Sequence, residues 1–264
     1  EMCIRDSLEG VDRDWRFYDD EFLQYRPGTR LQIRDFSGYE GDPLGLSRYA
    51  ALLRAGRQNI SLMGHANVRY FLDGKGPLRA SQKIGTSIAP GIWELHDSAP
   101  AVYYVPAPQV AADAGSALKM LRLIKPGTGA VVEGEVRAGQ EDLPITIGRI
   151  TKHRPNELRA EIETPGPGLV VIAEAYYPKW EAKVNGKATT ILPANVMFRG
   201  IPVDSAGVHQ ISMKLSPKRF YYLLPAYLCA FFLFLWAIFP RRKKASPAIS
   251  PEARAAESSR PHSS

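Results

Sequence analysis

The sequence predicts an α+β protein with a mixed α/β subdomain, then an antiparallel β-sandwich, then one C-terminal transmembrane helix. Helix signals and strand-like runs alternate in residues 8–128. From residue 129 to 216 the pattern changes to short alternating runs separated by turn residues, which is typical of a sandwich. Residues 220–239 are twenty residues without a charge, the length that a helix needs to cross about 30 Å of hydrocarbon.

Composition and charge exclude two classes of protein. With 264 residues, 45% hydrophobic and 23% charged, the chain has the composition of a folded protein rather than a disordered one. Its net charge of +7 is concentrated near the C-terminus, because residues 241–264 hold six bases and two acids and Lys214, Lys218 and Arg219 precede them. This leaves 25 bases and 25 acids in residues 1–213, so nucleic acid is not an expected partner.

The subdomain at 8–128 contains two predicted helices and three predicted strands. Asp42-Pro43, followed by an apolar stripe to Leu53 and then Gly56, predicts an amphipathic helix with an Asp cap, Pro at its first position and Gly just past its end. Residues 116–124 predict a second helix, with Ser116 as its cap. The strand-like runs, rich in β-branched and aromatic residues, are 67–72, 92–96 and 101–105.

The subdomain at 129–216 contains eight predicted strands, at 130–136, 145–151, 157–164, 169–177, 180–184, 187–192, 196–203 and 208–215. Asn185-Gly186 lies between two of them and suits the positive φ angles of a type I′ turn. In the strand before this turn we expect Trp180, Ala182 and Val184 to face the core. The residues between them should face water.

The predicted transmembrane helix spans 217–240. Its leucines, phenylalanines and isoleucine give about −3 to −7 kcal/mol for insertion, and four bases follow at once in 241–244. These bases favour a disordered cytoplasmic tail at 241–264 and an extracytoplasmic position for residues 8–216. A buried core helix and a tail-anchored cytoplasmic protein are the alternatives.

The first seven residues are predicted to be a non-native leader, since EMCIRDS resembles translated sequencing-adapter sequence. Residues 1–30 contain no apolar segment of a signal peptide. Because an outside-facing domain needs a way across the membrane, we expect further spans to precede this chain.

No catalytic, cofactor or metal motif is found in the sequence. The five histidines lack the spacing and the cysteine partners of a zinc site. Gly74-Lys75-Gly76 lacks the spacing of a phosphate loop, and 85–89 lacks the closing glycine of a nucleophile elbow. We therefore predict no catalytic residue, no cofactor and no metal ion.

Two stretches nevertheless resemble a known family. The first consists of residues 37–44, Arg48-Tyr49 and 67–70. The second consists of 175–180, Asn185-Gly186, Asn195, Arg199-Gly200 and 207–209. In their order these motifs resemble the bacterial YfhO-like membrane proteins, in the portion after their many spans, and the likeness covers about residues 30–240.

The resemblance implies the C-terminal extracytoplasmic portion of a polytopic protein of the bacterial plasma membrane. Such proteins are similar to lipid-linked-sugar-dependent glycosyltransferases of cell-envelope glycosylation. The implied partners are the lipid bilayer and a cell-envelope glycan or polyprenyl-phosphate sugar. The family's acidic catalytic residue lies in an early loop that this sequence does not contain, so we expect this fragment alone to be inactive. The alternative is a non-enzymatic, membrane-anchored β-sandwich that binds envelope glycan or a protein partner.

The candidate glycan-binding residues are Tyr176, Tyr177, Trp180, Asn195, Arg199 and His209. The aromatic rings would stack on a sugar, and the polar side chains would contact its hydroxyls. A structural interpretation competes with this one, with Trp180 in the sandwich core and Asn195 bound to loop backbone. The residue types alone favour the structural interpretation.

Overall fold

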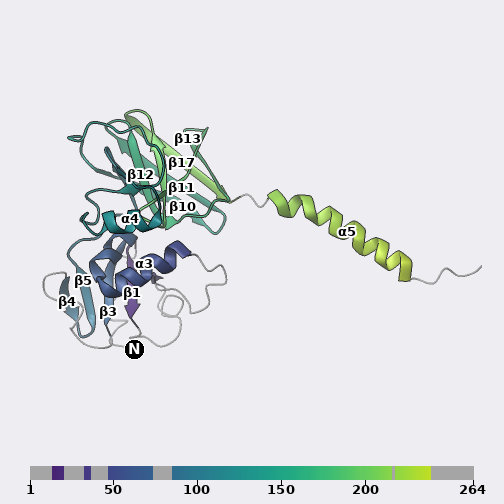
Figure 1. Ribbon diagram of the computed structural model, residues 1–264, viewed down its shortest axis with the longest axis horizontal. Helices are drawn as coiled ribbons and strands as arrows, with labels where there is room; N and C mark the ends of the chain where they lie inside the picture. Colours follow the sequence, from purple (N-terminus) through teal and green to yellow (C-terminus); the bar gives the residue numbers. More distant parts are fainter. Residues whose placement is uncertain (1–13, 21–32, 37–46, 74–84, 216–217, 239–264) are drawn as a thin grey trace, which may run out of the picture. The chain divides into compact units, whose positions relative to one another are not determined.

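The computed structural model describes residues 14–20, 33–36, 47–73, 85–215 and 218–238. These residues form three β-sheets and four helices, and the chain divides into two units, 1–216 and 217–264 (Figure 1). The predicted α+β class is therefore wrong, because the protein is mainly β. A sheet also forms in the part of the chain that was predicted to be mixed α/β.

Sheet A is the N-terminal sheet, with the strand order β2-β1-β3-β5-β4. Its strands are β1 (Arg16–Asp20), β2 (Arg34–Asp35), β3 (Val68–Asp73), β4 (Gly85–Ala89) and β5 (Ile92–Leu95). Strand β1 runs parallel to both of its neighbours, whereas β3, β5 and β4 are antiparallel. Stacked rings of Phe17 and Tyr70 lie on one face of this sheet, with centroids 4.8 Å apart.

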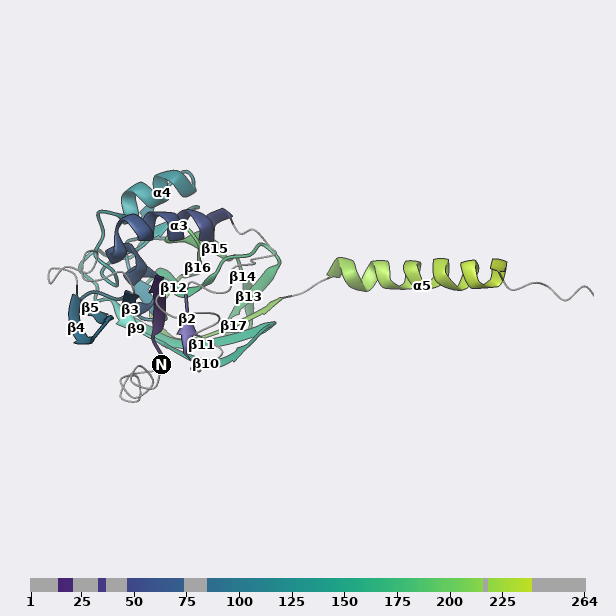
Figure 2. The ribbon, with the colours of Figure 1, turned by 90° about the horizontal axis from the view of Figure 1, so that it is seen from below.

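Sheets B and C are formed by strands between residues 102 and 215. Sheet B has the order β7 (Gln109–Val110), β8 (Val131–Val132), β15 (Leu192–Ala194), β16 (Phe198–Val203), β12 (Gly168–Ala175), β6 (Val102–Val105) and β9 (Thr146–Ile147). Sheet C has the order β10 (Arg149–Arg154), β11 (Glu157–Thr164), β17 (Gly207–Leu215), β13 (Trp180–Val184) and β14 (Lys187–Thr189). Figure 2 shows β10, β11, β17, β13 and β14 following one another across sheet C.

An apolar core joins sheets B and C face to face. In β11 the alternate residues Leu158, Ala160 and Ile162 are buried, and they pack with Val170 and Ile172 of β12. Because successive side chains of a strand point to opposite faces, the residues between them on β11 point to solvent. Because of this alternation, sheet C has one buried face and one solvent-exposed face.

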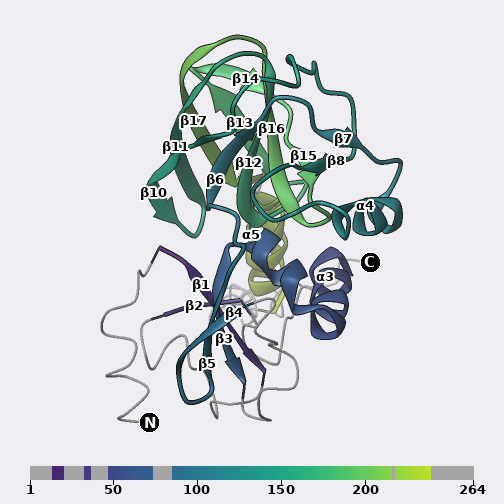
Figure 3. The same cartoon turned by 90° about the vertical axis from the view of Figure 1, so that its left-hand side faces the viewer.

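The opposite face of sheet B packs against three helices and sheet A (Figure 3). The helices are α3 (Ser47–Gln58), η1 (Ile60–Ala66) and α4 (Ala114–Leu121). The predicted Asp42-Pro43 start of α3 lies outside the described residues. Its predicted end is wrong, since Gly56 lies within the helix. A Cβ there would come 1.9 Å from Cε of Met63, so this glycine permits close packing rather than ending the helix.

The cap of α4 also differs from the prediction. Asp113 accepts a hydrogen bond from the backbone N–H of Ser116 at 2.8 Å, and the Ser116 hydroxyl contacts the Asp113 backbone N–H in return at 3.1 Å. This is a reciprocal capping box, with Asp113 as the cap and Ser116 in the first turn.

Two predicted strands are each divided between sheets. The run at 145–151 separates at Gly148 into β9 of sheet B and β10 of sheet C. A Cβ at Gly148 would lie 2.7 Å from the carbonyl oxygen of Glu161, so the crossing requires glycine. The run at 187–192 likewise separates into β14 of sheet C and the start of β15 of sheet B.

The predicted hairpin turn is confirmed. Asn185 and Gly186 have φ angles of 50° and 82°, as a type I′ turn requires, and they connect β13 to β14. Ala182 is buried, and Trp180 and Val184 pack against the core between the sheets.

The predicted transmembrane helix is corrected. Helix α5 (Lys218–Ile238) is present, but no helix in the described part of the chain is long and apolar enough to span a membrane. The predicted extracytoplasmic position of 8–216 and the cytoplasmic tail at 241–264 depended on this span and are corrected with it.

Candidate functional site

The three predicted aromatic residues lie in and beside the loop between β12 and β13. The backbone N–H of Trp180 donates to the carbonyl of Tyr177 at 3.2 Å, which closes the loop as a turn. The backbone N–H of Tyr176 donates to the carbonyl of Met197 at 2.7 Å. Backbone bonds at both ends of the loop therefore hold the three rings close together.

A groove of about 1090 Å³ lies against sheet C and begins at this loop. Tyr176, Tyr177 and Trp180 line one end, and the turn at Asn185-Gly186 lines the other, because β13 runs between them. The charged and polar side chains along the groove are Thr151, Arg159, Glu161, Glu181, Lys183, Thr189, Thr190, Gln210, Ser212 and Lys214. The groove thus has an aromatic end and a polar floor.

Arg199 supports the aromatic end from inside the protein. Its guanidinium carbon lies 3.8 Å from the centre of the Trp180 ring, and its Nε donates to the carbonyl of Ala175 at 2.9 Å. Arg199 is only 5% exposed, and Nη1 has no hydrogen-bond partner among the described residues. Burial lowers the pKa of Arg199 to about 10, although the charge of Glu174 opposes that shift. Arg199 does not line the groove, but it holds the Trp180 ring in place.

Asn195 lies in the core rather than at the groove. Its side chain donates to the Tyr103 hydroxyl at 2.7 Å and accepts from the backbone N–H of Val131 at 2.9 Å. Its φ of 44° is in the left-handed region, which asparagine tolerates better than most residues. The side chain therefore connects β15, β8 and β6 of sheet B.

His209 is also buried away from the groove, on β17. Its Nε2 lies 3.0 Å from the Thr164 hydroxyl and 3.0 Å from the carbonyl of Ser205. These contacts close the end of the β11–β17 pair. The structure thus brings three of the six candidate residues together at a surface and places the other three inside.

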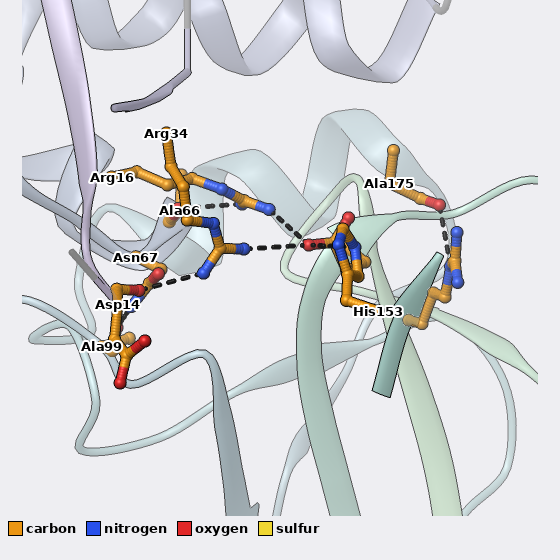
Figure 4. A network of polar contacts seen from close by, with 10 residues as sticks. Asp14, Arg16, Arg34, Ala66, Asn67, Ala99, His153 and Ala175 are labelled. Carbon is orange, nitrogen blue, oxygen red and sulfur yellow. Dashed lines mark hydrogen bonds and ion pairs between the residues drawn. The ribbon is translucent and has the colours of Figure 1, made fainter. Parts of the chain in front are cut away.

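A cluster of charged side chains lies where sheet A meets sheets B and C (Figure 4). Glu174, within a bulge of β12, accepts hydrogen bonds from Arg16 at 2.7 Å and Arg34 at 3.2 Å. His153 of β10 lies 3.4 Å from the same oxygen. Burial would raise the pKa of Glu174, but the hydrogen bond from His153 and the charges of the surrounding bases lower it to about 2. One ionised carboxylate therefore links three sheets.

The residues of the first resembling stretch have packing roles where they are described. Arg48 donates to both carboxylate oxygens of Glu133 and, at 2.8 Å, to the carbonyl of Val196. The side chain of Asn67 donates to the carbonyl of Ala99 at 3.1 Å. Residues 37–44 lie outside the described residues.

A smaller hollow of about 320 Å³ lies beside sheet A. Its polar side chains already bind one another, since Arg69 pairs with Glu94 at 2.6 Å and the Thr86 hydroxyl lies 3.0 Å from Nε2 of His96. Among the described residues no group of three or more His, Cys, Asp or Glu could hold a metal ion. The groove on sheet C is therefore the better candidate for a binding site.

Sequence reasoning did not identify the charged residues of this groove or the Glu174 cluster. The alternation of apolar and polar residues predicted which side chains of β11, β13 and β17 point outward. It did not predict which of these side chains line the same groove. Glu174 had no local signal, because Arg16, Arg34 and His153 reach it from distant parts of the chain.

No family model, no curated protein and no solved structure matches this chain. The predicted YfhO-like, glycosyltransferase-like membrane protein has a membrane part and a family part, which stand differently. The membrane part is contradicted, because no helix in the described part of the chain could span a membrane, whereas the comparisons leave the family part untested. The resemblance of the two stretches stays a prediction.

Proposed function

We propose that the first unit is a non-enzymatic glycan-binding module and that its ligand lies in the groove on sheet C. The observation that carries the proposal is the combination of Tyr176, Tyr177 and Trp180 at one end with a row of polar side chains on the floor. A sugar ring has an apolar face of C–H groups and a rim of hydroxyls. It therefore suits a site with an aromatic wall and several converging polar groups.

Preorganisation of the aromatic end supports this proposal. The loop is fixed by its backbone hydrogen bonds, and the Trp180 ring rests on the Arg199 guanidinium. Side chains that are already ordered lose little conformational entropy on binding, so more of the contact free energy appears as affinity. Tyr177 remains 37% exposed and can contact a ligand.

Binding of the full chain to a glycan array tests the proposal. We expect at least one glycan to bind, and Tyr177→Ala to weaken its binding about tenfold, the effect of losing one aromatic contact worth about 1.4 kcal/mol. Tyr227→Ala is the matched control, because Tyr227 is 71% exposed on α5 and does not line the groove. A folded wild-type protein that binds no glycan would contradict the proposal.

A further inference from the structure

The charges of the groove indicate which kind of glycan it takes. Arg159 of β11 and Lys183 of β13 are both aligned with Ser212 of β17, on the strand between them. All three line the groove. Adjacent strands are about 4.8 Å apart, so the two basic residues flank the serine with their Cα atoms about 10 Å from each other. A hydroxyl thus lies between two positive charges on one line across the sheet.

Two of the three side chains on this line have no side-chain partner among the described residues. Among the described residues Lys183 forms no ion pair and the Ser212 hydroxyl forms no hydrogen bond. Arg159 pairs with Glu157 at 3.0 Å through Nε and Nη2, which leaves its other N–H groups free to donate.

The neighbouring acids do not compensate Lys183. Glu161 pairs with Arg149 at 3.0 Å, and among the described residues no ion pair joins Lys183 to Glu161 or Glu181. Three bases and two acids line the groove, so one positive charge is in excess.

We infer that the groove binds an acidic glycan, whose anionic group lies over Ser212 between Arg159 and Lys183. The inference rests on the proposed function and adds the class of ligand. A carboxylate, phosphate or sulfate oxygen there would accept charge-assisted hydrogen bonds from both bases.

Calorimetric titration of the full chain tests the inference, with an oligogalacturonate and its fully methyl-esterified form as probes. The two differ in charge but share their sugar rings. We expect the acid to bind about tenfold more tightly at low salt and this preference to shrink as salt is added. A sulfated and a phosphorylated oligosaccharide, run beside them, show which anionic group is preferred.

Two substitutions test whether Lys183 causes the preference for the acidic probe. Lys183→Gln should remove most of the preference for the acid, because it weakens binding of the acid more than binding of the methyl ester. Lys187→Gln is the matched control, because Lys187 is exposed on the adjoining strand but does not line the groove. Equal loss in the two variants would overturn the inference, since it would show attraction to general surface charge.

The outcomes separate the two proposals. If the ester binds as tightly as the acid, or if only neutral glycans bind on the array, the inference about charge is wrong and the module still binds glycan. If neither the probes nor any glycan of the array binds the folded protein, the proposed function is wrong and the inference falls with it.

Discussion

The Glu174 cluster and the groove on sheet C use the same kinds of residue in different surroundings. In the cluster, the side chains of Arg16 and Glu174 are only 12% and 17% exposed. In the groove, the Arg159 side chain is 55% exposed. Buried charges depend on one another, because removing one leaves its partner in a medium of low polarity. Exposed charges are solvated in any case, so they contribute little to stability and stay available to a ligand.

The largest expected effect is on the cluster. Glu174→Gln should lower the free energy of unfolding by about 4 kcal/mol, because it leaves the buried Arg16 without an anion. Urea denaturation followed by tryptophan fluorescence measures this value. Glu163→Gln is the matched control on β11, since Glu163 is exposed, and it should change stability by less than about 0.5 kcal/mol. Equal effects would remove the distinction between the two regions.

Low pH should lower the stability of the protein through the same carboxylate, that of Glu174. The pKa of Glu174 is about 2 in the folded protein and 4.5 as the reference value, so the unfolded state takes up the proton first. The stability that Glu174 contributes is therefore present above pH 4.5 and is lost as the pH falls toward 2. The loss amounts to about 3 kcal/mol. Between pH 4.5 and 2 the free energy of unfolding should fall by about 3 kcal/mol more in the wild type than in Glu174→Gln. If this free energy falls in parallel in the two proteins, Glu174 is not the group responsible.

A smaller effect should follow from a change that keeps the charge. Arg16 donates to Glu174 and also to the carbonyl of Ala66 at 3.2 Å. A lysine has one ammonium group and cannot keep both contacts in this geometry, so Arg16→Lys should cost about 1 to 2 kcal/mol. Arg159→Lys, in the groove, should cost less than about 0.5 kcal/mol in the same denaturation experiment.

The sequence predicted elements whose signal is local. Alternation identified β11 and β13 with their observed ends, and the Asn-Gly pair identified the hairpin, because each depends on neighbours in the chain. The fold class was wrong because sheet membership depends on distant pairings. At Gly148 the chain passes from sheet B to sheet C, and at Gly56 it packs closely against Met63. Both features depend on tertiary contacts, so no periodic pattern in the sequence predicts them.

The candidate site was predicted in part for the same reason. Tyr176, Tyr177 and Trp180 are close in sequence, and a turn brings their rings to one surface. Asn195 bonds to Tyr103, 92 residues away, so its place in the core could not be read from its own neighbourhood. Arg199 is the informative intermediate case, because it belongs to the site only through the ring that it supports.

The smallest expected effect on stability completes the comparison. Lys183→Gln should leave the free energy of unfolding within about 0.5 kcal/mol of the wild type, because Lys183 is exposed and forms no ion pair among the described residues. Removal of a like charge from a basic groove could even stabilise the fold slightly, and that gain should disappear at high salt. If denaturation instead shows a loss above about 1 kcal/mol, Lys183 has a structural partner. The groove would then resemble the Glu174 cluster rather than contrast with it.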